Sequence, residues 1–418
     1  MTALVPAPLV APPLVAPPLA LYVHLPWCVR KCPYCDFNSH AREGRIPEER
    51  YVSALLNDLD SQIGDARGRQ LVSCFFGGGT PSLFSPAAID RLLLGIRARL
   101  ALAPDAEVTL EANPGTVEHG RFAEYRAAGV TRVSLGGQSF NARHLQVLGR
   151  IHSADETRRA VAELASAGID NFNIDLMYGL PGQEVAESLA DVDAALELGP
   201  AHVSHYQLTL EPGTVFFHRP PVLPDEDACW EMQMRCQERL AAAGFGQYEI
   251  SGYARSGRRC RHNLNYWQFG DYLGIGAGAH GKVTDALRGL VARTAAVRQP
   301  RQYLDSFAPD APANGKPAQV TARDRHVVGP EDLPFEFMLN ALRLVEGFTR
   351  EQYESRTGQS LRGVRGIITV AESKGLLEEG AGAGYRPTPL GLRFLNDLQA
   401  SFLPAGRALV ATQEANPR

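Results

Sequence analysis

Three cysteines near the N-terminus have a spacing that suits iron–sulfur chemistry. Cys28, Cys32 and Cys35 form a Cys-x-x-x-Cys-x-x-Cys pattern, and Tyr34 and Phe37 lie beside them. Three thiolates can hold three irons of a 4Fe–4S cluster and leave the fourth iron without a protein ligand. The amino and carboxylate groups of S-adenosylmethionine (SAM) can chelate such an open iron, and an electron from the cluster then cleaves the sulfonium C–S bond. The pattern therefore predicts a cluster that works together with SAM.

Two other interpretations of these cysteines stay open at this point. A zinc ion could use His24 or His40 as a fourth ligand, or the three thiols could be buried without any metal. Structural zinc sites usually combine two close ligands with a second, distant pair, and no second pair is visible in this sequence. The chain has seven cysteines, an odd number, and no secretory signal, so we expect a reducing cytoplasm and no disulfide framework.

Glycines and polar residues follow several predicted strands. Gly78, Gly79 and Thr80 end one of them. Glycines let the backbone approach a ligand closely, although such a loop can also be only a tight turn. Polar residues at or just after other strand ends are Glu111, Gln138, Arg150 and Asp175. Arg150 and Asp175 could bind a carboxylate and ribose hydroxyls in one cavity, or they could form a structural ion pair.

A second group of chemically capable residues lies in the stretch from Cys260 to Trp267. A nitrogen of His262 can ligate heme iron, with the Cys260 thiolate as an alternative ligand, and Tyr266 and Trp267 offer flat apolar faces to a macrocycle. Three arginines nearby could pair with propionates, namely Arg258, Arg259 and Arg261. An aromatic loop with one histidine can also be plain packing, so this reading stays open from the residues alone.

The elements that must position these residues alternate between two patterns. Strands are predicted near 21–25, 71–76, 107–111, 131–135, 172–177, 202–208 and 247–251. Amphipathic helices are predicted at 47–63, 86–100, 154–167, 184–198 and 226–243. Alternation of this kind predicts right-handed crossovers and a parallel sheet. About six β/α units fit, which predicts an α/β fold with an open, partial barrel and its chemistry at the carboxyl ends of the strands.

The chain divides into five expected regions. We expect a disordered proline-rich tail at 1–20, a partial barrel at 21–251, a heme-binding loop with a lid or edge region at 252–329, a small, partly helical, winged-helix-like domain at 330–405, and a frayed tail at 406–418. Of the residues, 44% are apolar and 21% charged, with a net charge of −4. This composition gives no support for nucleic-acid binding, and no transmembrane segment is expected.

From about residue 21 to 400 the chain resembles a known family. The cysteine pattern after the strand at 21–25, together with the glycine loop, resembles the radical SAM signature, and the chain is similar to the oxygen-independent coproporphyrinogen III oxidase-like branch. The resemblance implies a cluster on Cys28, Cys32 and Cys35. It also implies that SAM is bound by Tyr22, Tyr34, Gly78, Gly79, Thr80, Glu111, Gln138, Arg150 and Asp175.

Within that branch, the chain looks like the HemW-type heme chaperones. The porphyrin-making enzymes have a fourth cysteine where this chain has Phe37, and they have a longer N-terminal segment. The His-Asn-x-x-Tyr-Trp stretch resembles the heme-binding motif of the chaperones. The resemblance implies heme contacts from His262, Asn263, Tyr266 and Trp267, with Cys260 as an alternative.

These observations give two expected functions. The first is a heme chaperone that binds a 4Fe–4S cluster, SAM and heme and transfers heme to an acceptor hemoprotein, for example a membrane-associated respiratory one. The second is a radical SAM enzyme that acts on a tetrapyrrole, by oxidative decarboxylation of coproporphyrinogen III or by methylation. We expect a cytoplasmic protein, with attachment at the inner membrane and a homodimer as further expectations. The sequence leaves open the acceptor, the axial heme ligand, covalent attachment and the need for SAM cleavage.

Overall fold

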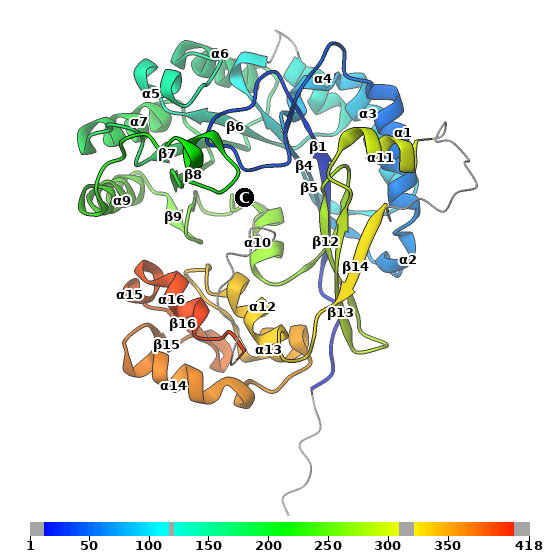
Figure 1. Ribbon diagram of the computed structural model, residues 1–418, viewed down its shortest axis with the longest axis vertical. Helices are drawn as coiled ribbons and strands as arrows, with labels where there is room; N and C mark the ends of the chain where they lie inside the picture. The colour runs from blue at the N-terminus through cyan, green and yellow to red at the C-terminus, as the bar shows by residue number, and fades with distance from the viewer. Residues whose placement is uncertain (1–11, 117–120, 309–321, 405–418) are drawn as a thin grey trace, which may run out of the picture.

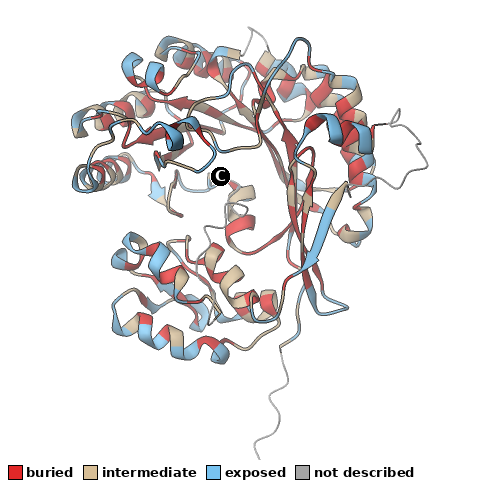
Figure 2. Ribbon diagram, viewed as in Figure 1, coloured by how far each residue is buried: buried red, intermediate tan, exposed pale blue. Residues whose placement is uncertain are grey.

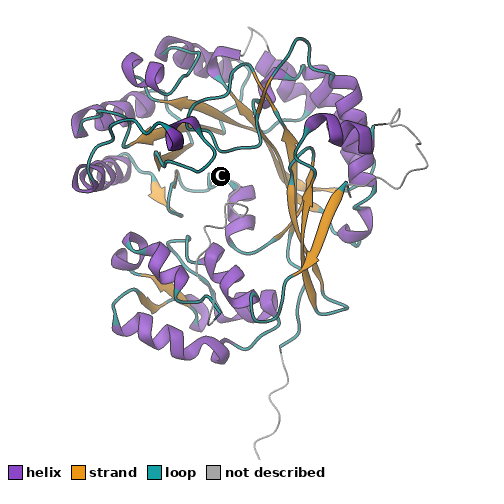
Figure 3. Ribbon diagram, viewed as in Figure 1, coloured by secondary structure: helices purple, strands orange, loops and turns teal. Residues whose placement is uncertain are grey.

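The computed structural model describes residues 12–116, 121–308 and 322–404. A sheet of twelve strands forms its centre, and the six of its strands that come first in the chain, between residues 19 and 207, lie side by side and run parallel. The six are β1 (Leu19–Leu25), β4 (Leu71–Gly78), β5 (Leu102–Ala112), β6 (Arg132–Gln138), β7 (Phe172–Tyr178) and β8 (His202–Gln207). The sheet curves, with helices on its outer side (Figures 1 and 3). This confirms the expected α/β class with an open, partial barrel.

The helices between the strands bury one face against the sheet. The longer ones are α1 (Glu48–Asp60), α3 (Pro86–Arg97), α4 (Arg121–Ala128), α6 (Ala154–Ser166), α7 (Val185–Glu197) and α9 (Glu226–Ala242). Short ones are α2 (Ile63–Ala66), α5 (Ala142–Val147) and α8 (Val215–His218). Local signals set their starts: Ser85 caps α3, and Ser153 forms a capping box with Glu156 in α6. Within the described residues, no helix is long and apolar enough to cross a membrane.

Antiparallel strands extend the sheet beyond β1, where a lid or edge region was expected. Strand β11 (Asp271–Ile275) pairs in parallel with β1, and β12 (His280–Asp285), β13 (Leu290–Ala296) and β14 (Arg323–Val327) follow as antiparallel neighbours. Helix α11 (Pro300–Phe307) then packs against α1. The region is an edge of the sheet, but it is an integral part of it. Strand β1, with which β11 pairs, lies some 250 positions earlier in the chain. No local sequence pattern therefore predicts this extension of the sheet.

The strand predicted at 247–251 is wrong. The chain forms β9 (Gly246–Gln247), turns, and returns as β10 (Gly252–Ala254), which pairs antiparallel with both β9 and β8. The turn is closed by the N–H of Tyr248, which donates to the carbonyl of Gly252 at 3.0 Å. A Cβ on Gly252 would lie 2.8 Å from ring carbons of the buried Tyr248, so the tight turn depends on glycine.

The proline-rich segment is shorter than expected. Strand β1 begins at Leu19, which is fully buried, inside the segment 1–20 for which a disordered tail was expected. Just before it, the N–H of Val15 donates to the carbonyl of Ser355 at 2.8 Å, and Leu14 packs against the C-terminal core. Residues 1–11 and the expected frayed tail at 406–418 lie outside the described residues.

The C-terminal part is mainly helical and has its own hydrophobic core. It comprises α12 (Leu333–Ala341), α13 (Arg350–Thr357), α14 (Arg365–Ser373), α15 (Pro389–Arg393), α16 (Leu395–Ala400) and the hairpin β15 (Leu377–Glu379) with β16 (Tyr385–Pro387). Phe337, Phe348 and Tyr353 belong to this core, and Val291 of β13 and Phe269, in the turn before β11, join it. Buried residues therefore continue from the sheet into this part (Figure 2).

A buried ion pair fixes the sheet extension. Asp271, at the start of β11, is fully buried and accepts hydrogen bonds from Lys282 Nζ at 2.7 Å, Arg69 Nη1 at 2.7 Å and Thr284 Oγ1 at 2.8 Å. Burial alone would raise the pKa of Asp271, but Lys282 and Arg69 hold this pKa below its usual value. Strand β11, strand β12 and the loop after α2 are therefore held together by the charge of one carboxylate.

We therefore expect Asp271→Asn to lower the free energy of unfolding by about 3–5 kcal/mol, because Lys282 and Arg69 would remain buried without their counter-charge. Urea unfolding followed by circular dichroism measures the effect. Asp170→Asn is the matched control, since Asp170 pairs with Arg258 at the surface and should change stability by less than about 1 kcal/mol. Equal effects of the two substitutions would contradict this account.

Candidate cofactor and ligand cavity

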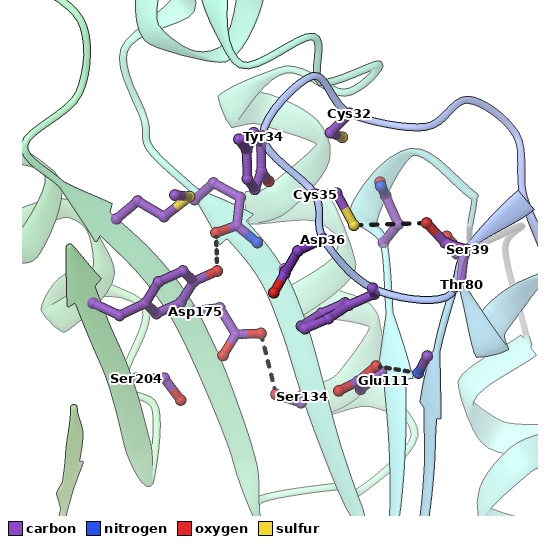
Figure 4. A pocket seen from close by; sticks show the side chains of 18 of the residues that line it. Cys32, Tyr34, Cys35, Asp36, Ser39, Thr80, Glu111, Ser134, Asp175 and Ser204 are labelled. Atoms are coloured by element: carbon purple, nitrogen blue, oxygen red, sulfur yellow. Dashed lines mark hydrogen bonds between the residues drawn. The ribbon is translucent and has the colours of Figure 1, made fainter. Parts of the chain in front are cut away.

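The open sheet encloses a cavity of about 1050 Å³. Its walls come from the inner faces of β4 to β8, and the cysteine loop after β1 lines it as well (Figure 4). Helix α10 (Arg261–Trp267), which packs against β4 and β1, contributes Asn263 and Trp267. Single small-molecule sites usually occupy about 300–1000 Å³, so this cavity is at or beyond the upper limit of that range. It has room for more than one ligand.

The three predicted cluster cysteines all line the cavity. Each sulfur has a hydrogen-bond partner: Cys28 accepts from Thr80 Oγ1 at 3.4 Å, Cys32 from Arg150 Nη1 at 3.8 Å, and Cys35 Sγ lies 3.6 Å from Ser39 Oγ. Burial raises the pKa of Cys28 to about 11 and also raises that of Cys35, so a cluster bound here would have to displace the protons of these two thiols. Donors around thiolates are typical of iron–sulfur ligand loops.

The zinc alternative does not fit this geometry. Both ring nitrogens of His24 are engaged, Nδ1 with Tyr22 Oη and Nε2 with the carbonyl of Asn38, each at 3.0 Å. His40 Nε2 faces Asn38 Oδ1 at 3.3 Å. Nowhere in residues 12–116, 121–308 and 322–404 do three His, Cys, Asp or Glu side chains converge as a single-ion site. Three sulfurs spread over one loop instead suit a larger, multi-iron group.

The glycine loop is shaped for a close approach to the cysteine loop. Gly78 has a φ of +114°, and a Cβ there would lie 2.5 Å from the His24 ring. A Cβ on Gly79 would lie 2.6 Å from the carbonyl oxygen of Trp27. The N–H of Thr80 donates to that same oxygen at 2.8 Å. Side chains at these positions would push the two loops apart, which is why both positions require glycine.

Two carboxylates face the cavity from neighbouring regions of the sheet (Figure 4). Glu111 Oε2 accepts from the N–H of Gly78 at 3.2 Å. Asp175 accepts from Asn173 Nδ2 at 2.7 Å and from Ser134 Oγ at 3.2 Å. Burial, followed by the charge of Asp175, raises the pKa of Glu111 to about 8, and burial also raises the pKa of Asp175. Such carboxylates suit a cationic or hydroxyl-bearing ligand.

The other predicted SAM residues differ in their placement. Arg150 lines the cavity and donates to the carbonyl of Gly136 at 2.8 Å; in the described part of the chain it forms no ion pair with Asp175. Gln138 has a φ of +66° and accepts from Tyr206 Oη at 2.6 Å. Tyr34 also lines the cavity, whereas Tyr22 lies behind its wall against His24 and Phe75.

The predicted heme residues are divided between the cavity and its surroundings. Cys260, Asn263 and Trp267 line the cavity, and His262 and Tyr266 do not. His262 Nδ1 lies 3.2 Å from Ser73 Oγ, and its ring stacks on Phe75 at 4.9 Å. Loss of hydration lowers the pKa of His262 to about 4. The histidine therefore anchors α10 to β4 in this structure.

The alternative thiolate ligand is also disfavoured. The Cys260 thiol donates to Glu107 Oε1 at 3.5 Å. Burial, followed by the Glu107 charge, raises the pKa of Cys260 to about 12, so the group is a thiol at neutral pH. A neutral thiol is a poor ligand for iron.

The three arginines expected near heme propionates face the surface instead. Each pairs with an exposed carboxylate: Arg258 with Asp170 at 2.8 Å, Arg259 with Glu346 at 2.6 Å, and Arg261 with Asp105 at 2.6 Å. The expectation that they hold propionates is therefore wrong for this structure. The closeness of these arginines to Cys260 in the sequence did not show that their side chains point away from the cavity.

Known proteins match nearly the whole chain. A model of the Radical SAM superfamily matches residues 22–195, and a model of the HemN C-terminal domain matches residues 328–394. Heme chaperone HemW of Escherichia coli (strain K12) is 49% identical over 385 residues, which cover 92% of this chain and 98% of that protein. The chain belongs to the HemW family of radical SAM proteins. This membership confirms the resemblance drawn from the cysteine pattern and the His-Asn-x-x-Tyr-Trp stretch.

Other relatives agree with the HemW assignment. Heme chaperone HemW of Haemophilus influenzae is 46% identical over 390 residues, covering 92% of this chain and 98% of that protein. A mouse protein, radical S-adenosyl methionine domain-containing protein 1, mitochondrial, is 36% identical and covers 92% of this chain and 87% of itself. Among solved structures, coproporphyrinogen III oxidase HemN from Escherichia coli has a TM-score of 0.75 over 93% of this chain and 90% of that chain, at 20% identity. This last similarity shows the fold.

Membership of the radical SAM superfamily implies a 4Fe–4S cluster and SAM. The site of this HemW-family chain fits both groups. The cluster would rest on Cys28, Cys32 and Cys35, and Glu111 and Asp175 offer acceptors to SAM on the adjoining wall. Bound together, the two groups supply one-electron cleavage of a sulfonium bond.

Several cavity residues were missed by the sequence analysis. They occupy alternate positions on three neighbouring strands: Arg132 and Ser134 on β6, Asn173 and Met177 on β7, and His202, Ser204 and Tyr206 on β8. Side chains two positions apart point to the same face of a strand. Polar residues at every second position of these strands were a sequence signal that one face of the sheet lines a polar cavity.

Glu111 gives a pH-dependent prediction. Its pKa of about 8 in the folded protein exceeds the ordinary value of 4.5, so between these pH values only the folded chain holds the proton. The contribution of Glu111 to the free energy of unfolding must therefore fall as the pH rises through this interval, and Glu111→Gln should remove that loss. Relative to the natural chain, the unfolding temperature of the variant should rise from pH 5 to pH 8.5, because the difference in unfolding free energy changes by up to about 1.4 kcal/mol per pH unit.

Thermal unfolding of the cluster-loaded, SAM-free protein at several pH values measures this difference. Glu197→Gln, at an exposed position on α7, is the matched control and should show a difference that does not vary with pH. A pH-independent difference for Glu111→Gln would show that Glu111 is ionised in the folded protein throughout.

Proposed function

We propose that this chain is a heme chaperone, which binds a 4Fe–4S cluster, SAM and heme and passes heme to an acceptor hemoprotein. One observation carries the proposal: the cysteine loop and helix α10 line the same cavity. The cluster ligands are Cys28, Cys32 and Cys35. Heme and SAM would then be bound within reach of one another. The names of the HemW relatives point to the same function.

The heme contacts proposed here follow from the placement of α10. Asn263 and Trp267 would touch the macrocycle, because both line the cavity. His262 and Tyr266 would hold the helix: His262 packs on Phe75, and the Tyr266 ring lies 4.8 Å from that of Trp267. For SAM, we propose Gly78, Gly79, Thr80, Glu111, Gln138, Arg150, Asp175 and Tyr34 as contacts, with Tyr22 supporting them from behind.

The acceptor and the setting belong to the same proposal. We propose a hemoprotein acceptor, for example a respiratory one at the inner membrane, reached from the cytoplasm, and a homodimeric assembly. The second candidate is a radical SAM enzyme that acts on a tetrapyrrole, such as a coproporphyrinogen III decarboxylase. The fold shared with HemN supports it, but Phe37 lines the cavity where the porphyrin-making enzymes carry a fourth cysteine.

Heme titration of the anaerobically reconstituted protein tests the proposal. We expect a saturable Soret band and no protoporphyrinogen when coproporphyrinogen, SAM and a reductant are added to the same sample. A variant with Cys28, Cys32 and Cys35 all changed to Ala shows whether heme uptake needs the cluster. Cluster-loaded, SAM-binding protein that takes up no heme would overturn the chaperone function. Formation of protoporphyrinogen would establish the enzymatic alternative.

His262 gives a sharper test of the heme contacts. We expect His262→Gln to keep the position of the Soret maximum and to weaken heme binding by no more than about 10-fold, because the imidazole faces Ser73 and Phe75. Absorption spectra of both proteins with heme measure this. His326→Gln, at an exposed position on β14, controls for loose binding of heme to surface histidines. A shifted Soret maximum in His262→Gln alone would mean that His262 turns into the cavity and ligates iron.

A further inference from the structure

A buried arginine that forms no ion pair with any described residue lines the cavity. Arg132 begins β6, is only 2% exposed, and is one of the residues in the cavity wall. Its Nη1 donates to Asn171 Oδ1 at 3.0 Å and to the carbonyl of Arg258 at 3.4 Å, both neutral acceptors. Within the described part of the chain it forms no ion pair, and Nε and Nη2 have no protein acceptor. A buried cation of this kind normally has an anionic partner.

A second unpartnered donor lies in the same cavity. The indole Nε1–H of Trp267 has no acceptor among the described residues, although Trp267 is only 6% exposed. The Asn263 side chain, one helical turn earlier on α10, lines the cavity and likewise forms no hydrogen bond with any described residue. Buried tryptophan N–H groups usually find a partner, so the pair of donors is consistent with a ligand acceptor.

These three residues lie at the end of the cavity opposite the cysteines. Arg132 is the first residue of β6, whereas the cysteine loop follows the last residue of β1, and both strands belong to the same parallel set. The chain around Cys260 joins the groups: Arg132 donates to the carbonyl of Arg258, and Asn263 and Trp267 follow in α10. We call Arg132, Asn263 and Trp267 the cavity floor.

The acidic residues near the floor are already engaged. Glu249 pairs with Arg343 at 3.4 Å, and the Arg343 guanidinium lies 4.3 Å from the centre of the Trp267 ring. Glu107 lies outside the cavity lining and accepts from the N–H of Arg261 at 3.0 Å. Asp175 accepts from Ser134 and Asn173. The charge of Arg132 counteracts the rise in the pKa of Asp175, so the two groups lie within electrostatic reach, but no described carboxylate forms an ion pair with Arg132.

We propose that the cavity floor is a carboxylate-binding subsite, which takes a propionate of the tetrapyrrole through Arg132, Asn263 and Trp267. The inference rests on the proposed function, and it names the part of heme that the floor binds. An arginine fork matches the two oxygens of a carboxylate, and the indole and amide N–H groups add neutral donors. In this arrangement the carboxylate forms an ion pair with Arg132, and the macrocycle is oriented with a propionate edge away from the cluster.

The test compares heme with its dimethyl ester, in which both propionates lose their charge. Cluster-loaded protein should bind heme about 10- to 100-fold more tightly than the ester. Arg132→Gln should weaken heme binding by a similar factor while leaving the affinity for the ester unchanged. Trp267→Phe keeps a ring against Arg343 but removes the N–H, and it should weaken heme binding by a smaller factor.

Controls separate this subsite from other effects. Arg258→Gln is the matched control, because its side chain pairs with Asp170 at the surface, and it should bind heme normally. Iron content and SAM affinity of Arg132→Gln should equal those of the natural chain, which shows that the fold and the cluster end of the cavity are intact. If a carboxylate of SAM occupied the floor instead, Arg132→Gln would lose SAM and retain heme.

Equal affinities for heme and its ester in the natural chain would overturn the subsite while leaving the chaperone function in place. Failure of the natural chain to bind either compound would instead refute the proposed function. If Arg132→Gln folds poorly, the comparison of the two ligands on the natural chain and on Trp267→Phe still decides the question.

Discussion

The structure depends on an inner sheet face that is polar and stays open. In a closed barrel, layers of branched apolar side chains fill the interior. Here the inward positions of β6, β7 and β8 carry polar residues, among them Ser134, Asn173 and His202. They satisfy one another: Asn173 bonds to Ser134 at 2.7 Å and to His202 at 2.7 Å. Because these polar side chains form hydrogen bonds with one another, the inner face of the sheet can line a cavity and does not need an apolar filling.

Holding such a sheet open requires rigid borders. On one side, β11 to β14 extend it and are fixed by the buried carboxylate of Asp271, which joins Arg69 and Lys282. On the other side, the hairpin of β9 and β10 covers β8. Helix α10 packs beneath β4 and touches α12 of the C-terminal part. The C-terminal part thereby supports one wall of the cavity as well as forming its own core.

Burial gives the two ends of the cavity different chemistry. Near the cysteine loop, burial favours the neutral forms of the Cys28 thiol and the Glu111 carboxyl, so a cluster or a cationic ligand bound there would displace protons. At the floor, Arg132 is buried and forms no ion pair with any carboxylate of the described residues. A cation-accepting end and an anion-accepting end within one cavity suit two different ligands, and the low dielectric of the interior strengthens both preferences.

The sequence by itself determined the features that depend on local spacing. The cysteine triplet, the glycine loop, the five amphipathic helices and the six parallel strands all follow from patterns within a few turns of chain. Only the tertiary structure decided where side chains of irregular segments point and which distant strands pair. The tertiary structure placed His262 against Phe75, put Arg258, Arg259 and Arg261 at the surface, and paired β11 with β1. It also placed Arg132 and Trp267 in the wall of one cavity. These outcomes depend on contacts between residues far apart in the chain, which no local period records.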